Sequence, residues 1–178
     1  TGNIGSGHIS ENVVVSGSYA FVADDMAGLQ VINISNLAVP TRIGTFNTPV
    51  NAHDVAISGA YAYVADCDGG MEVYNISNLA VPTLTATYNT GFHASRVSVS
   101  GNYVYMGAGE AGVLIFDTST PAVPTWISTF DPAGQAGEVF VSGNYAYAGF
   151  GSSGFRAINI SNLAVPTLTA TYYTPAGS

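Results

Sequence analysis

The side chains best suited to bind cations or to transfer protons gather in two short segments, around Asp66 and around His53. Asp66-Cys67-Asp68 is followed by two glycines, so oxygen ligands alternate before a sharp turn, as in calcium-binding loops. The segment lacks the longer loop and the closing glutamate of a complete calcium site. We therefore expect a turn stabilised by Asx hydrogen bonds. Ca²⁺ near Asp66 and Asp68 is the alternative, and we expect no other cofactor.

Two histidines, His53 and His93, are candidates for catalysis or metal binding. His53, His93 and Asp66 can approach one another if neighbouring parts of the chain pack together. The sequence has no His-Glu-x-x-His, Gly-x-Ser-x-Gly or Cys-x-x-Cys motif, the spacings typical of hydrolases and zinc sites. Cys67 has no basic neighbour in sequence to favour its thiolate, and we interpret it as a small incidental residue. We predict that the protein is not an enzyme.

These residues lie within a repeat of constant length. Prolines and glycines each recur every 42 residues, at Pro40, Pro82, Pro124 and Pro166 and at Gly17, Gly59, Gly101 and Gly143. A unit of this size cannot bury a core alone, so neighbouring units must supply the missing surface.

Each repeat has the pattern of four short strands. In the second repeat the segments 53–58, 61–66, 70–77 and 82–88 are rich in β-branched and aromatic residues and are bounded by turn-forming residues. Four-stranded antiparallel units with a period near 40 are typical of β-propeller blades, and a β-solenoid is the alternative. We predict an all-β, single-domain β-propeller over residues 1–178, with blades at approximately 8–49, 50–91, 92–133 and 134–175. The four blades would form a four-bladed ring or half of a larger ring.

The predicted second strand of each repeat carries two aromatic residues in alternation, for example Tyr19 and Phe21 in the first repeat. Residues two apart share one face of a strand, so we expect a column of rings packed between neighbouring blades.

The repeat resembles a known family. Gly28-Leu29-Gln30-Val31-Ile32-Asn33-Ile34-Ser35-Asn36, followed by Val39-Pro40-Thr41, is similar to the LVIVP repeat, as is the phrase from Val141 to Tyr147. The resemblance covers all four units and implies β-propeller domains of secreted and cell-surface proteins, without a catalytic motif. This chain departs from it where the family commonly has Asp at the end of the third strand: only Asp117 matches, and the other three repeats have Asn33, Asn75 and Asn159.

Those three asparagines lie in Asn-x-Ser sequons. We favour a role for their side chains in the following turn over glycosylation.

Strand order places the loops at two edges of each blade. The repeated rim holds the loops after the first and third strands, where Ile-Ser-Asn-Leu-Ala-Val-Pro-Thr occurs three times. The variable rim holds the loops after the second strand, at 24–26, 66–68, 108–110 and 150–152, and the segments leading into the first strand, at 11–12, 53–54, 95–96 and 137–138. Loops on a rigid scaffold commonly bind ligands. Our candidate binding residues are therefore Asp24, Asp25, His53, Asp54, Asp66, Asp68, His93, Arg96, Glu110 and Glu138.

The amino-acid composition excludes some classes of binding partner. The net charge is −8, lysine is absent and charged residues make up only 8% of the chain, so no basic surface for nucleic acid exists. The sequence contains no run of about 20 apolar residues, so we predict no transmembrane helix. We predict an extracellular or cell-surface location and a non-enzymatic scaffold or protein- or glycan-binding module. The alternatives are a structural subunit of a surface layer or filament, and a secreted or periplasmic enzyme that uses the variable rim.

Exposed apolar blade faces would also favour self-association. We expect two chains to form an eight-bladed ring, or subunits to stack into a larger assembly.

Overall fold

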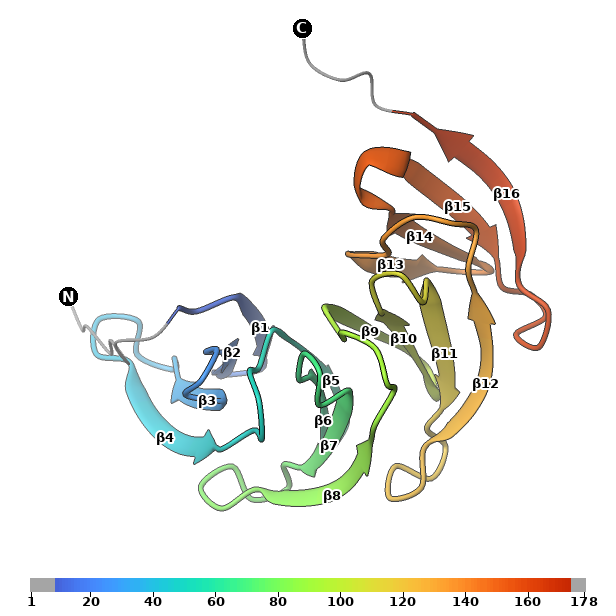
Figure 1. Ribbon diagram of the computed structural model, residues 1–178. Coiled ribbons are helices and arrows are strands. Elements are labelled where there is room, and N and C mark those ends of the chain that lie inside the picture. The colour runs from blue at the N-terminus through green and yellow to red at the C-terminus, as the bar shows by residue number, and fades with distance from the viewer. Residues whose placement is uncertain (1–8, 174–178) are drawn as a thin grey trace, which may run out of the picture. The chain divides into compact units, whose positions relative to one another are not determined.

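The computed structural model describes residues 9–173, which form four antiparallel sheets of four strands each (Figure 1). The first two sheets contain β1 (Asn12–Ser16), β2 (Tyr19–Ala23), β3 (Leu29–Asn33) and β4 (Thr41–Phe46), then β5 (Asp54–Ser58), β6 (Tyr61–Ala65), β7 (Met71–Asn75) and β8 (Thr83–Tyr88). The last two contain β9 (Arg96–Ser100), β10 (Tyr103–Gly107), β11 (Val113–Asp117) and β12 (Thr125–Phe130), then β13 (Val139–Ser142), β14 (Tyr145–Gly149), β15 (Phe155–Asn159) and β16 (Thr167–Tyr172). In every sheet the spatial order follows the chain order, which confirms the predicted four-stranded repeat.

Local chemistry explains the turns that were predicted. The glycine that follows the first strand adopts a positive φ in all four repeats, between 56° and 59°, a conformation that glycine takes without steric cost. The prolines that recur every 42 residues directly precede β4, β8, β12 and β16, where a missing N–H is tolerated.

Two local features were not predicted. The pairing of the third and fourth strands is interrupted by a register shift in every sheet, for example between Val31 and Ile32. The loop after β14 contains a single 3-10 turn, η1 (Gly151–Ser153).

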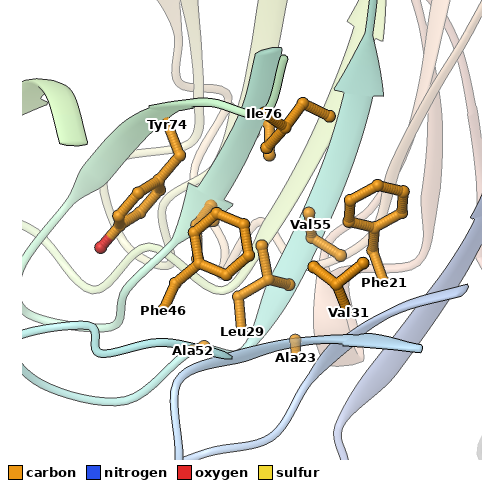
Figure 2. Packing of buried hydrophobic residues seen from close by; sticks show 11 residues of the cluster. Phe21, Ala23, Leu29, Val31, Phe46, Ala52, Val55, Tyr74 and Ile76 are labelled. Carbon is orange, nitrogen blue, oxygen red and sulfur yellow. The ribbon is translucent and has the colours of Figure 1, made fainter. Parts of the chain in front are cut away.

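The chain divides into two compact units, the first ending at Ala94 and the second beginning at Ser95, and each contains two sheets. In the first unit, the facing sides of two sheets enclose an apolar cluster (Figure 2). Phe21, Leu29 and Val31 of the first sheet pack with Val55 and Tyr74 of the second, and all are at most 4% exposed. Burial of each large apolar side chain contributes about 1.5–3 kcal/mol, so this cluster holds the two sheets together.

The second unit repeats the arrangement. Tyr105 and Ile115 of its first sheet pack with Val139, Phe150 and Ile158 around its second sheet. Phe21 and Tyr105 pack between sheets as predicted for the aromatic residues of the second strands, whereas Tyr145 on β14 is 37% exposed.

The constant sequence of the repeated rim has a packing explanation. Leu79 and Leu163, from the loops before β8 and β16, pack against the apolar cluster of their own unit. Leu37 occupies the same repeat position before β4 and is 81% exposed. The loop therefore acts as a contact between one sheet and the preceding one.

The sequon asparagines take the predicted turn role. Oδ1 of Asn33, Asn75 and Asn159 each accepts a hydrogen bond of 2.9 Å from the backbone N–H of the serine two residues later.

Candidate functional site

Backbone hydrogen bonds join the two kinds of segment that form the variable rim. In the first unit, the N–H and C=O of Asp25 pair with those of Ala52, at 3.2 and 3.1 Å, and the N–H of Ala94 donates to Cys67 O at 2.8 Å. Gly109 and Ala136 pair in the same way in the second unit. The loops after β2, β6 and β10 are thus each fastened to a segment that follows the fourth strand of the same sheet, so both kinds of segment share one edge.

Three of the predicted binding carboxylates are buried and support the loops from beneath. Asp24 and Asp54 are 2% exposed, and Asp66 is fully buried. Oδ1 of Asp24 accepts a hydrogen bond from Ser10 Oγ at 2.9 Å, and Oδ2 of Asp66 accepts one from the N–H of Val50 at 3.1 Å.

Asp54 has a similar role. Its Oδ1 accepts a hydrogen bond of 2.8 Å from the backbone N–H of Val55 and another from Asn12 Nδ2. Burial raises the pKa of Asp66, and the hydrogen bond from Val50 opposes that rise. These three residues are buried and hydrogen-bonded beneath the loops, and a direct binding role for them stays a prediction.

The remaining predicted residues are accessible, but they divide between the units. In the first unit, Asp68 and His93 are exposed, and Asp25 and His53 are partly buried. In the second unit, Glu110 and Glu138 are exposed and Arg96 is partly buried. Arg96 Nε lies 3.0 Å from Glu138 Oε2, and Arg96 also donates to Ser95 O at 2.7 Å.

The turn at Asp66 differs in detail from its prediction. Backbone hydrogen bonds close it, from Gly69 N to Asp66 O at 2.7 Å and from Asp66 N to Gly70 O at 2.9 Å, in place of the expected Asx bonds. Asp66 is buried and Asp68 is exposed, so calcium at this turn stays an untested prediction.

The predicted approach of His53 and His93 is confirmed, with their ring centroids 5.3 Å apart and the rings inclined at 69°. Cys67 joins the two histidines in this group, and Asp66 lies close enough for His53 to lower its pKa. One ligand atom each of His53, Cys67 and His93 lies within 4.8 Å of the others. Burial, and then the nearby carboxylates of Asp66 and three other acidic residues, raise the pKa of the Cys67 thiol to about 11. The sequence signal for this group was the alignment of repeats: no other repeat has a histidine or cysteine at the positions equivalent to His53, Cys67 and His93.

A buried polar pair inside the second sheet was also missed. Glu72 on β7 is fully buried, and its Oε2 accepts a hydrogen bond of 2.6 Å from the Tyr74 hydroxyl. Burial raises the pKa of Glu72 to about 7, while that hydrogen bond opposes the rise. The equivalent positions hold Gln30, Leu114 and Arg156, so no repeat rule predicts a carboxylate here.

With the fold and the rim described, comparisons with known proteins define the class of the chain. The LVIVD repeat matches at residues 7–48, 50–90, 91–131 and 133–174, so this protein belongs to the LVIVD repeat family. No curated protein has significant sequence similarity to the chain.

Solved structures with similar folds confirm the β-propeller architecture. A functionally unknown protein from Desulfotomaculum acetoxidans superposes with a TM-score of 0.80 at 17% identity, over 98% of this chain and 59% of that one. The β-propeller domain of Cps50 (Swd1) from Myceliophteria thermophila gives 0.76 at 10% identity, over 93% and 60%. The computationally designed Ika8 protein gives 0.73 at 12% identity, over 90% and 48%.

This chain therefore spans about half to three-fifths of the length of these structures. Neither the family nor these structures indicates an enzyme class. Among residues 9–173, no helix is long and apolar enough to cross a membrane.

Proposed function

We propose that this β-propeller is a non-enzymatic interaction module that works outside the cell and binds its partner through the variable rim of the first unit. The observation that supports it most is charge: Glu11, Asp25 and Asp68 are accessible there, and all three act on the same Cys67 thiol. The only arginine or lysine between positions 9 and 94 is Arg42, on β4 beside the repeated rim. A rim with carboxylates and no arginine or lysine favours a cationic patch on a protein, and a polar glycan is the alternative partner.

The extracellular location is supported by the surface chemistry. Lysine is absent, and Ser, Thr, Asn and Gly cover surface that charged residues cover in most soluble proteins. Limited proteolysis of intact producing cells, followed by detection of the protein, tests the location. Protection until the cells are lysed would contradict it.

Binding at the rim is tested with accessible side chains only, because substitution of buried Asp54 or Asp66 would disturb the fold. The combined variant Glu11→Gln, Asp25→Asn and Asp68→Asn removes three negative charges and keeps side-chain size. Its affinity for a lysine- and arginine-rich peptide should fall at least about tenfold relative to the unchanged protein, since each charge pair contributes a modest amount. Retained affinity, or equal affinity for a neutral peptide, would contradict the proposal. A glycan array identifies the alternative partner.

A second function, as a self-associating structural subunit, is favoured by one apolar surface. Val13 and Val15 on β1 are 55% and 61% exposed, and Leu37, in the loop between β3 and β4, is 81% exposed. Leu79 and Leu163 show that this loop position packs on an adjacent sheet where one is present. We propose that a second copy of the chain covers the surface around Leu37.

Sedimentation analysis tests this second candidate. Leu37→Gln should weaken association. Val39→Gln is the matched control, because the equivalent valines Val81, Val123 and Val165 are also more than half exposed. A protein that is monomeric at all concentrations, or equal effects of the two variants, would exclude association through this surface.

A further inference from the structure

We propose that His53, Cys67 and His93 form a binding site for a transition-metal ion, with Zn²⁺ as the first candidate. The site lies wholly within the first unit, and its three ligands are not among the carboxylates proposed above to bind the partner. One nitrogen of each histidine and the sulfur of Cys67 lie within 4.8 Å of one another. Zn²⁺ binds imidazole nitrogen at about 2.0–2.1 Å and thiolate sulfur at about 2.3 Å, which places tetrahedral ligand atoms about 3.5 Å apart. A contraction of roughly 1 Å therefore completes the geometry, and rotation of the exposed His93 side chain can supply it.

Backbone hydrogen bonds connect the three segments that carry the proposed ligands. The N–H of Ala94, which follows His93, donates to the carbonyl oxygen of Cys67 at 2.8 Å. The N–H of His53 donates to Ala65 O at 2.9 Å, two residues before Cys67. The three ligand-bearing segments are therefore fixed to one another by main-chain hydrogen bonds, and only side chains must move when the ion binds.

Histidine and cysteine do not occur at the equivalent positions of the other repeats. The positions equivalent to Cys67 hold Asp25, Gly109 and Gly151, and those equivalent to His53 and His93 include Ser95 and Gln135. The single cysteine and two of the three histidines of the chain thus meet at one place.

The backbone conformation at Cys67 is unusual for a cysteine. Its φ is 46°, in the left-handed region where the equivalent residues are Asp25, at 48°, and glycines. Aspartate and glycine are enriched in this conformation, and cysteine is not. Local strain of this kind is commonly retained where the side chain has a function.

The surroundings favour a cation of the soft or borderline class. Thiolate and imidazole ligands suit Zn²⁺ and copper, and they do not suit Ca²⁺ or Mg²⁺. The carboxylates of Asp66, Asp68, Asp25 and Glu11 all act on the Cys67 sulfur and supply negative potential. On binding, the thiol releases its proton to solvent and the sulfur donates an electron pair to the ion. Three protein ligands, with His93 at the surface, leave a fourth position for water or for a group on a partner.

The test uses Co²⁺ and Zn²⁺ with the intact chain. We expect one equivalent of Co²⁺ to produce a thiolate-to-metal charge-transfer absorption, and one equivalent of Zn²⁺ to abolish it by displacement. The variant Cys67→Gly should lose the absorption completely. His53→Ser and His93→Gln, which introduce the residues found one repeat later at Ser95 and Gln135, should each weaken binding at least about tenfold.

The repeat also supplies the controls. Cys67→Gly should fold at least as stably as the unchanged metal-free protein, because glycine adopts the required φ without cost. His8→Gln, at the third histidine of the chain, should bind Zn²⁺ normally. The site should also be transferable: Ser95→His, Gly109→Cys and Gln135→His, combined, should add a second equivalent of bound metal.

Three results would overturn the proposal: no charge-transfer absorption with Co²⁺, Zn²⁺ affinity of Cys67→Gly within about twofold of the unchanged chain, or loss of binding in His8→Gln. Stabilisation by Ca²⁺ equal to that by Zn²⁺ would also assign the cation site to the surrounding carboxylates instead.

Discussion

Arg96 and Glu138 occupy the same position in consecutive repeats, and Nε of Arg96 lies 3.0 Å from Oε2 of Glu138. Asn12 and Asp54, again 42 residues apart, are joined by a hydrogen bond in the first unit. Residues that share a position in the repeat thus become neighbours across adjacent sheets. When two consecutive repeats have different residues at such a position, the two side chains can therefore pair with each other across the adjacent sheets.

The Arg96–Glu138 pair should contribute little to stability. The two side chains are 29% and 70% exposed, and ion pairs at such exposure contribute about 0–1 kcal/mol. We expect a double-mutant cycle with Arg96→Ala and Glu138→Ala, measured by urea unfolding, to give a coupling energy in that range that falls as salt is added. A coupling energy well above it would mean that the pair is more shielded from solvent than its exposure indicates.

Glu72 should make the protein less stable as the pH rises. Burial raises its pKa from 4.5 to about 7 in the folded protein, so between these values the folded state binds more protons than the unfolded state. The free energy of unfolding should therefore fall through this window, by at most roughly 3 kcal/mol, and the effect of Glu72 should be constant at higher pH. Glu72→Gln should remove this part of the slope in urea unfolding at about pH 5 and about pH 8.

Tyr74→Phe provides the matched comparison. The Tyr74 hydroxyl donates to the Glu72 carboxylate at 2.6 Å and favours its ionised form. Without that donor the pKa of Glu72 should rise further and the pH dependence should extend upward. Identical pH dependence in the unchanged protein and in Glu72→Gln would show that Glu72 is not the responsible group.

Gly44 is required by the approach of a loop of the repeated rim. A Cβ at this position would lie 2.2 Å from the carbonyl oxygen of Leu79. Gly44→Ala should therefore lower the free energy of unfolding by roughly 1–3 kcal/mol, because the loop must move away.

Ser128 is the equivalent residue of the second unit, and its Oγ donates to Leu163 O at 2.5 Å. Ser128→Ala retains the Cβ and loses one hydrogen bond, with an expected cost of about 1 kcal/mol. Urea unfolding of both variants tests the comparison. If Gly44→Ala is the less damaging change, close packing against Leu79 is not the reason for the glycine.

Much of the fold could be predicted because its signals are local. Gly17 and its equivalents required a positive φ, and alternation of residues such as Tyr19 and Phe21 identified the face of the second strand that packs in the core. The register shifts beside Val31 were missed, because an interrupted pairing depends on the neighbouring strand and leaves no pattern in the strand itself.

The candidate site was predicted only in outline. Strand order sufficed to place the loops of the variable rim at one edge. It did not show that Asp24 and Asp66 point beneath the loops, since burial of a loop carboxylate is decided by contacts with other segments. Cys67 was discounted because its partners His53 and His93 are distant in sequence and meet it only in the folded chain.

The most direct test of the proposed interaction surface is an NMR titration of the isotope-labelled chain with a lysine- and arginine-rich peptide. Our account predicts saturable shifts of backbone amides in the variable rim of the first unit, at residues 24–28, 51–54 and 66–70. Amides of the repeated rim, at residues 35–39 and 77–81, should be unaffected, and a neutral peptide of equal length should cause no shifts. Shifts confined to the repeated rim would contradict the account.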